Sequence, residues 1–384
     1  MRGFPKEEYQ NRIFKLQEKM QISNIDVILI TSPHNFRYFT GFDSYFWESP
    51  TRPWFLLISL SEEPVAIIPN IGESALKKTW INKINTWSSP NTDDEGVSIL
   101  TKTIKKLVSS KKNIGCELGQ ENHLRMSIND YDKLKINLSD FNFVDASAII
   151  WKLTMIKSKE EIKKIKKIIS IASNVFDNLP NFIKIGMTEK EICNIFKKQL
   201  IDKGADHTLY MSCASGKGGY DQIICDPTNK EIENGDILII DTGTTYDGYF
   251  CDFDRNYGFG KIQKEAIEAY LTLWEASEKA FERIKPGLNC SDISHAINSI
   301  LDKSNLNLNS VGRMGHGLGL QLTEPPSIMN NDKTILKENM IITIEPCYEY
   351  LPGKMLVLEE NILITENGFE LLTTRSPKFL PIIN

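Results

Sequence analysis

The segment DTGTTYDGYFCDFDR, residues 241–255, decides the fold of the C-terminal part of the chain. It holds four aspartates and one arginine, and its Asp247-Gly248 pair is a strong signal for a two-residue hairpin turn. Asp241 ends the apolar run DILII, whereas Asp252 and Asp254 alternate with apolar residues. Side chains two residues apart on a strand point to the same face, so the sequence predicts a hairpin that gathers carboxylates on one face.

The composition of the whole chain limits its class and its partners. Because 384 residues exceed one comfortable hydrophobic core, we expect two domains. A net charge of −5 and a pI near 5.7 show no excess of basic residues, so we expect no nucleic-acid partner. There is no apolar run of about 18 residues and no apolar signal-peptide core, so we expect no membrane association and a cytoplasmic location. The seven cysteines are scattered without a Cys-x-x-Cys pair, which suits reduced thiols.

Two units are visible along the sequence. Residues 1 to about 150 combine the helical pattern EEYQNRIFKLQEKMQISNI with apolar strands such as DVILITS and PVAIIPNI, which predicts an α/β domain. A long helical pattern from Ser158 to about Leu179 opens the second unit. The next helix is expected to begin after the N-cap Thr188, to complete a capping box at Glu191 and to end at Gly204.

Three further motifs of the second unit carry polar residues in apolar surroundings. His316 lies among glycines in the segment GRMGHGLGLQLTEPP. Glu345 ends the apolar strand in NMIITIEPCYEY, and Glu359 and Glu360 lie in MLVLEENILIT. A buried, unpaired carboxylate costs several kcal/mol, so such glutamates need a partner. For the crowded aspartates the candidates are a divalent metal, a buried arginine or lysine, and open water. Five ligands rich in oxygen suit a pair of divalent ions, Mn or Fe before Zn, which could activate a water molecule.

The order and spacing of these motifs resemble the pita-bread metallopeptidase family, which includes aminopeptidase P, prolidase, methionine aminopeptidase and creatinase. The matching positions are Asp241, an aspartate eleven residues later, GHG, IEP, and LEEN before a final strand. The resemblance covers essentially the whole chain. It implies an α/β (α+β) fold with a creatinase-type N-terminal domain at residues 1–153, including NFRYFTGF, and a pita-bread metal-binding catalytic domain at residues 154–384.

The resemblance also implies a centre of two divalent ions, Mn first, with Fe, Co or Zn as alternatives. Asp241 would chelate one ion, His316 and Glu345 the other, and Asp252 and Glu359 would bridge both. His316 and Glu345 are the expected catalytic residues, with Glu345 handling a proton. The implied activity is that of a Xaa-Pro aminopeptidase or dipeptidase, in which a metal-bound hydroxide attacks the amide C–N group of a short peptide or another small molecule.

The hairpin leaves the identity of the bridging aspartate open. A regular two-residue turn at Asp247-Gly248 pairs Asp241 with Asp254, whereas the family spacing selects Asp252. A β-bulge in one strand would reconcile the two.

The chain departs from the peptidases at two histidines. Thr323 stands seven residues after His316, where the family has a second histidine, and Ile224, Cys225 and Asp226 precede PTN where it has another. Because threonine cannot transfer a proton near neutral pH as imidazole does, we expect weak activity on ordinary Xaa-Pro peptides. Thr323 is instead a candidate substrate-binding residue. Cys225 has no basic neighbour in sequence, which favours packing over a nucleophilic role.

Two other classes of function fit parts of the pattern. A fold-mate could act on a small zwitterion by creatinase-like or ectoine-hydrolase-like C–N hydrolysis, or as a dimethylsulfoniopropionate lyase. Gly243 argues against the lyase, because that branch has an aspartate two residues after the first ligand. A binding module with a vestigial metal site would lack ligands, whereas all five positions are acidic or histidine here.

The segment YFWESPTRPWF, residues 45–55, is a candidate lid over the substrate. In creatinase-type dimers this domain reaches the neighbouring active site, so the resemblance implies a homodimer whose Trp47 and Arg52 contact the substrate. Aromatic faces attract cations and arginine clamps carboxylates. With Asp254 as an extra acid near the metal ligands, this combination favours a small zwitterion. The alternative is that the aromatic residues fill the N-terminal core and that Arg52 lies on the surface.

Overall fold

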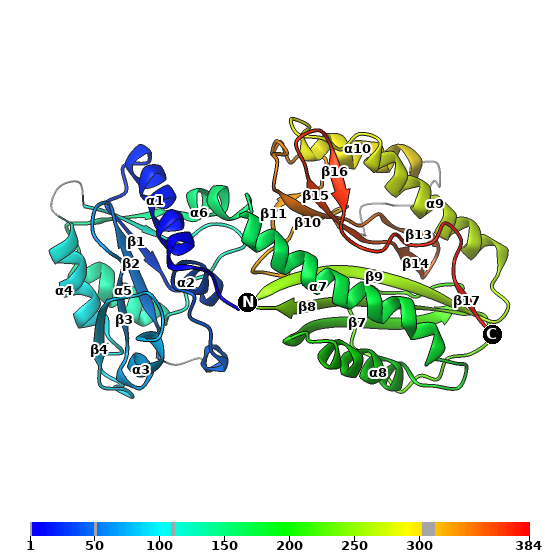
Figure 1. Ribbon diagram of the computed structural model, residues 1–384, viewed down its shortest axis with the longest axis horizontal. Helices are drawn as coiled ribbons and strands as arrows, with labels where there is room; N and C mark the ends of the chain where they lie inside the picture. Colours follow the sequence, from blue (N-terminus) through cyan, green and yellow to red (C-terminus); the bar gives the residue numbers. More distant parts are fainter. Residues whose placement is uncertain (1, 50–51, 109–111, 302–311) are drawn as a thin grey trace. The chain divides into compact units, whose positions relative to one another are not determined.

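The computed structural model describes residues 2–49, 52–108, 112–301 and 312–384, and the chain forms two compact units, Met1–Thr154 and Met155–Asn384 (Figure 1). Each unit has its own core of buried aliphatic and aromatic side chains. Both units mix helices and strands, so the predicted α/β class is confirmed. None of the helices in the described ranges combines the length and the apolar character needed to cross a membrane.

The first unit is built on a six-stranded mixed sheet in the order β4-β3-β2-β1-β5-β6. Its strands are β1 (Val27–Ile30), β2 (Phe55–Ser59), β3 (Val65–Pro69), β4 (Lys83–Trp87), β5 (Asn113–Cys116) and β6 (Asn142–Asp145). Its α-helices are α1 (Lys6–Ile22), α2 (Pro33–Thr40), α3 (Glu73–Leu76), α4 (Val97–Leu107), α5 (Ile128–Asn137) and α6 (Ser147–Thr154). The apolar runs of β1, β2 and β3 are buried over their whole length, because helices cover the sheet (Figure 1).

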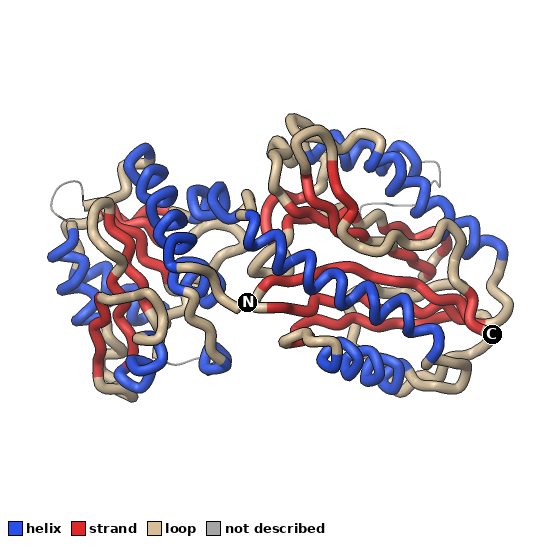
Figure 2. Tube along the Cα trace, in the orientation of Figure 1, coloured by secondary structure: helices blue, strands red, loops and turns tan. Residues whose placement is uncertain are grey.

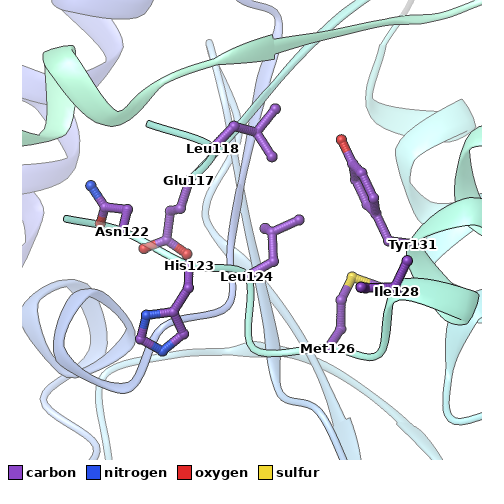
Figure 3. A pocket seen from close by; sticks show the side chains of 8 residues that line it. All are labelled: Glu117, Leu118, Asn122, His123, Leu124, Met126, Ile128 and Tyr131. Atoms are coloured by element: carbon purple, nitrogen blue, oxygen red, sulfur yellow. The ribbon is translucent and has the colours of Figure 1, made fainter. Parts of the chain in front are cut away.

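A buried carboxylate fixes the start of α2. Glu117 follows β5, is fully buried, and accepts hydrogen bonds from the backbone amides of Thr31 and Ser32 and from the side chain of Asn35. A negative charge is favourable at a helix N-terminus. Glu117 also borders a cavity of about 260 Å³ whose other walls include Leu124 and further apolar side chains (Figure 3).

The second unit packs two main sheets between helices. One sheet has the order β17-β9-β8-β7 and the other β11-β10-β12-β15-β16, with β13-β14 as a separate pair. In Figure 2 these strands lie between α8 on one side and α9 with α10 on the other. The helices are α7 (Lys159–Asn178), α8 (Glu189–Asp202), α9 (Lys264–Phe281) and α10 (Cys290–Leu301). The strands are β7 (His207–Lys217), β8 (Asp236–Tyr246), β9 (Tyr249–Phe259), β10 (His316–Gly317), β11 (Glu324–Ser327), β12 (Ile341–Ile344), β13 (Cys347–Leu351), β14 (Lys354–Val357), β15 (Glu360–Ile364), β16 (Phe369–Leu371) and β17 (Ile382–Ile383).

The predicted helix ends of this unit are confirmed. Thr188 and Glu191 form the capping box of α8, in which each side chain accepts a hydrogen bond from the other residue's backbone amide. Gly204 follows the end of α8 with a φ of +99°, a conformation that glycine adopts without a steric penalty. A second capping box, of Ser158 and Glu161, starts α7.

The β8–β9 hairpin is regular. Asp247 and Gly248 both have positive φ, as a type I′ turn requires, and Asp241 lies directly opposite Asp254. Over residues 236–259, all of which the structure describes, the two strands pair without a register shift, so no β-bulge reconciles the two candidate aspartates. A buried ion pair between Lys164 of α7 and Asp247 holds the tip of the hairpin.

Candidate metal centre

The five predicted ligands line one cavity of about 240 Å³ in the second unit. They come from neighbouring elements: Asp241 from β8, Asp252 from β9, His316 from β10, Glu345 after β12 and Glu359 before β15. Ligand atoms of Asp252, His316 and Glu359 lie within 4.8 Å of one another. Because Asp252 lies diagonally from Asp241 across the hairpin, a regular register is sufficient to bring both to the cavity.

Backbone and side-chain contacts orient His316. Its Nδ1–H donates to the carbonyl oxygen of Gly317 at 2.9 Å, which leaves Nε2 with its lone pair towards the cavity. Nε2 lies 3.4 Å from Oδ2 of Asp252 and 3.8 Å from Oε1 of Glu345. The position directly after His316 requires glycine, because a Cβ at Gly317 would lie 2.1 Å from the carbonyl oxygen of Pro325. The glycine-rich motif therefore lets β10 approach its neighbouring strands closely.

Burial and mutual repulsion raise the pKa values of the carboxylates. Desolvation raises the pKa of Asp241 to about 6 and, together with the charge of Asp241, that of Glu345 to about 8. The same causes raise the pKa values of Asp252 and Glu359 well above their ordinary range. Desolvation lowers the pKa of His316 to about 4, so the imidazole is neutral near pH 7. Four like charges beside a neutral imidazole call for a cation.

Two oxygens of this set have no hydrogen-bond partner among the described residues, namely Oδ1 of Asp241 and Oε1 of Glu359. Buried polar atoms normally have a partner, and a site for an ion is one reason for an exception. Oxygen atoms with one imidazole nitrogen are the donors that Mn²⁺ and similar divalent ions prefer. The residues present therefore fit a divalent metal centre.

We expect the metal-free protein to lose stability as the pH rises from 6.5 to 8. The pKa of Glu345 lies at about 8 in the folded chain against 4.5 when unperturbed, so the folded state retains a proton in this window that the unfolded state has released. His316 acts in the opposite direction only below its ordinary pKa of 6.5. At about 1.36 kcal/mol per unit, Glu345 contributes a loss of roughly 2 kcal/mol, and the other raised carboxylates add to it. Calorimetric melting of chelator-treated protein at both pH values measures the effect.

Saturating Mn²⁺ should reverse this dependence, because the ion replaces the proton and binds more tightly as the carboxylates ionise. Glu345→Gln is the matched control, since it preserves the shape of the side chain and cannot ionise. Metal-free protein that melts at a higher temperature at pH 8 than at pH 6.5 would contradict the prediction.

Comparison with known proteins identifies the family. Residues 163–366 match metallopeptidase family M24, and residues 12–156 match the creatinase/prolidase N-terminal domain. The chain belongs to family M24. An uncharacterized peptidase of Staphylococcus aureus strain MSSA476 is 30% identical over 373 residues, which cover 94% of this chain and 98% of the relative.

Solved structures of prolidases resemble the whole M24 chain. The recombinant prolidase of Thermococcus sibiricus superposes with a TM-score of 0.87 at 27% identity, covering 97% of this chain and 99% of that one. The Xaa-Pro dipeptidase of Bacillus anthracis gives a TM-score of 0.84 at 26% identity, with coverages of 97% and 99%. The predicted family and the creatinase-type and pita-bread fold are thus confirmed, and the protein is a metal-dependent peptidase. The zwitterion-cleaving alternative is not favoured by these relatives.

The M24 cavity has other residues at the two places where the family resemblance leads one to expect histidines. Thr323 and Ile224 both line it. Further lining side chains are apolar: Ile223, Ile239, Leu322 and Val357. Cys225 packs beside the cavity, with its thiol against the carbonyl oxygen of Cys213 at 3.2 Å.

The other predicted substrate-binding residues are not among those that line the cavity. Asp254 is 1% exposed and lies on β9, two residues after the lining residue Asp252. Trp47 belongs to the first unit, where its ring contacts Phe36 and Trp54 at centroid distances of 5.5 and 5.4 Å. Arg52 lies near the ring of Phe46 in the same unit. The contacts of Trp47 are those that the packing alternative predicts for it.

Sequence reasoning missed two polar residues of the cavity, Tyr210 on β7 and Arg313. The Tyr210 hydroxyl bonds to the carboxylate of Asp241. Arg313 donates to Oγ of Ser327 at 2.8 Å and brings a positive charge to the lining. Tyr210 has no local signal, because it precedes Asp241 by 31 residues. Arg313 could have been found, since it lies three residues before His316 in the same glycine-rich motif.

Proposed function

We propose that this peptidase is a Xaa-Pro dipeptidase whose centre holds two divalent ions, with Mn²⁺ first and Fe, Co or Zn as alternatives. The observation that carries the proposal is the set of five ligand side chains, four carboxylates and one imidazole, around a single cavity. In the proposed assignment Asp241 holds one ion, His316 and Glu345 hold the other, and Asp252 and Glu359 bridge them. The prolidase and Xaa-Pro dipeptidase titles of the similar structures support the substrate class.

When bound, the ions supply an activated water and a Lewis acid for the scissile carbonyl. Glu345 is suited to move the proton, because its carboxylate lines the cavity of the proposed centre and can both accept and return a proton. In this role its Oε1 takes the proton of the attacking water and passes it to the leaving nitrogen. The aliphatic side chains of Ile223, Leu322 and Val357 exclude bulk water from the reacting group.

Arg313 gives the cavity a preference for dipeptides. Its guanidinium is held by the hydrogen bond to Ser327, and arginine recognises a carboxylate through two parallel hydrogen bonds. The free carboxylate of a dipeptide lies one residue beyond the scissile bond, so a cation in the lining of the same cavity is within the reach of such a substrate. Thr323 takes the position of an imidazole and supplies a hydroxyl for a substrate hydrogen bond.

We expect chelator-treated protein to be inactive and Mn²⁺-reconstituted protein to hydrolyse Xaa-Pro dipeptides with two ions per chain. Without a second imidazole the rate should lie below that of a prolidase that has one, since such groups typically contribute about 10²- to 10⁴-fold. Ion content by elemental analysis and product release on Xaa-Pro dipeptides, creatine, ectoine and dimethylsulfoniopropionate provide the test. Less than about one ion per chain after reconstitution, or turnover of the zwitterions alone, would refute the proposal.

We also propose a cytoplasmic location, because all seven cysteines are free thiols, as a reducing compartment maintains them. The homodimer implied by the family resemblance stays a prediction, for which light scattering is the direct measurement.

A further inference from the structure

A further acidic residue lies next to the proposed ligands. Asp254 is opposite Asp241 in the hairpin, and residues directly opposite each other in an antiparallel pair share a face. Asp252, two residues before Asp254 on β9, shares that face as well. Asp254 is 1% exposed. The hairpin therefore presents three neighbouring carboxylates to the metal side, one more than the five-ligand set uses.

One oxygen of Asp254 is held and the other is left unpaired. Oδ1 accepts a hydrogen bond from the side-chain amide of Asn256 at 3.2 Å. Asn256 is itself fixed by Tyr220, whose hydroxyl donates to it at 3.2 Å, and by the carbonyl oxygen of Val357 at 2.6 Å. Oδ2 has no hydrogen-bond partner within the described ranges of the chain. A fixed, buried carboxylate with an unsatisfied oxygen is costly unless a cation compensates it.

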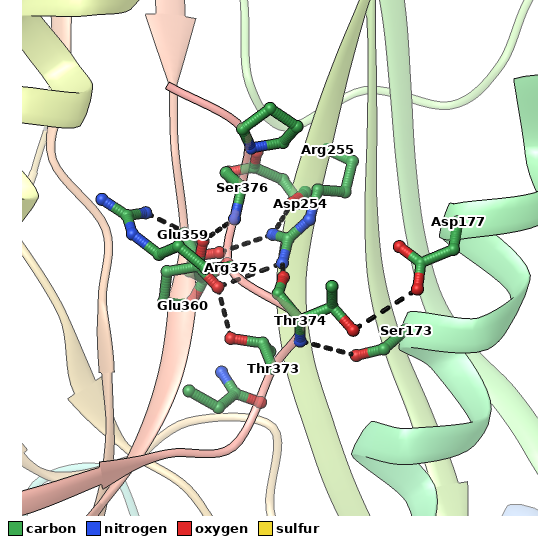
Figure 4. A network of polar contacts seen from close by, with 12 residues as sticks. Ser173, Asp177, Asp254, Arg255, Glu359, Glu360, Thr373, Thr374, Arg375 and Ser376 are labelled. Atoms are coloured by element: carbon green, nitrogen blue, oxygen red, sulfur yellow. Dashed lines mark hydrogen bonds and ion pairs between the residues drawn. The ribbon is translucent and has the colours of Figure 1, made fainter. Parts of the chain in front are cut away.

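The nearest arginine in sequence is already engaged by another carboxylate. The guanidinium of Arg255 donates to Oε2 of Glu360 at 3.0 Å and to the backbone carbonyl oxygen of Glu359 at 2.9 Å (Figure 4). It also donates a hydrogen bond to the backbone oxygen of Asp254. Glu360 receives a second cation, Arg375, at 2.9 Å. This network balances Glu360 and leaves Asp254 facing the metal side of the hairpin.

We propose that Asp254 is an additional acidic residue of the metal centre, whose negative charge strengthens the binding of divalent ions by Asp241 and Asp252. The inference rests on the two-ion centre proposed above. Partners that surround metal ligands typically change metal affinity by about 10- to 100-fold.

The test compares Mn²⁺ binding by the full-length parent, Asp254→Asn and a charge-matched control, using calorimetry and elemental analysis. Asp254→Asn keeps the shape and the contact with Asn256 but removes the charge. Asp236→Asn is the control, because Asp236 is also 1% exposed and lies five residues before Asp241 on the same strand, about 17 Å away. We expect Mn²⁺ affinity to fall about 10- to 100-fold in Asp254→Asn and to stay within about twofold in Asp236→Asn.

Melting of the metal-free proteins separates this role from a structural one. If Asp254 serves the metal, Asp254→Asn should melt no lower than the parent without metal, because it removes a repelling charge. If the parent binds two ions and Asp254→Asn binds Mn²⁺ with the same affinity as the parent, this inference alone is overturned. A lower metal-free melting temperature with unchanged affinity would assign Asp254 to packing. A parent that binds no Mn²⁺ would overturn the two-ion centre and this inference together.

Discussion

Asp252→Ala should empty the metal centre and reduce hydrolysis of a Xaa-Pro dipeptide by more than about 100-fold, the upper loss typical of replacing a residue that merely surrounds metal ligands. Asp252 has the most central position of the set: its Oδ2 lies 3.4 Å from Nε2 of His316, and its ligand atom lies within 4.8 Å of those of both His316 and Glu359. A bridging carboxylate contributes to both ions, so its removal affects both. The side-chain amide of Asn361 exchanges hydrogen bonds with the backbone of Asp252, which fixes the residue independently of its side chain.

Elemental analysis after reconstitution and dialysis gives the ion content, and dipeptide turnover gives the rate. Asp236→Asn, on the neighbouring strand β8 and outside the cavity lining, should retain both ions and most of the activity. If Asp252→Ala still holds two ions and turns over the dipeptide, Asp254 becomes the better candidate for the bridging ligand.

Local rules in the sequence were sufficient for part of the fold. The Asp247-Gly248 turn and the two-residue period place Asp252 and Asp254 on one face, and the structure has this arrangement. The capping box at Thr188 and Glu191 is equally local and is confirmed. Such features depend on a few neighbouring residues, so they can be recognised without knowledge of the rest of the chain.

Other features depend on how the two sheets of the second unit pack, and no local pattern reports this. β9 is buried along its whole length, so alternation between apolar and polar residues cannot tell which aspartate reaches the cavity. A β-bulge is not needed for this purpose, because a regular hairpin places Asp241 opposite Asp254 and still brings Asp252 to the cavity. Tyr210 reaches Asp241 through the pairing of β7 with β8, a contact between distant parts of the sequence.

The cluster behind the ligands illustrates the same limit. The sequence shows that Glu359 and Glu360 are adjacent acids in an apolar surrounding, and burial demands partners for both. It does not show that they face opposite environments. In the structure Glu360 is satisfied by Arg255 and Arg375 (Figure 4), whereas Oε1 of Glu359, a residue of the cavity lining, has no hydrogen-bond partner in the described part of the chain. The arginines come from β9 and from the segment after β16, which only the tertiary fold brings together.

Arg313→Ala should reduce kcat/KM for a Xaa-Pro dipeptide by about 30- to 5,000-fold. Removing one partner of a buried charged hydrogen-bonded pair costs about 2–5 kcal/mol, which gives this range at about 1.36 kcal/mol per tenfold. The loss should disappear for the same dipeptide with an amidated C-terminus, because that substrate has no carboxylate to hold. The positive charge of Arg313 also lowers the pKa values of Asp252 and Glu345, which burial and neighbouring carboxylates raise. Removal of Arg313 therefore has a general electrostatic effect as well. That general effect would lower the rates for both substrates equally, whereas carboxylate recognition affects only the free acid.

The competing candidate for binding the substrate carboxylate is Arg52 of the first unit, so its substitution provides a matched control. Both changes, Arg313→Ala and Arg52→Ala, remove one guanidinium, but only Arg313 lines the cavity that holds the metal ligands. We therefore expect Arg52→Ala to stay within about threefold of the parent on the free dipeptide, because Arg52 is not among the residues that line this cavity. If Arg52→Ala carries the loss and Arg313→Ala does not, the aromatic and basic segment of the first unit forms the substrate site, and the dipeptide preference assigned to Arg313 is wrong.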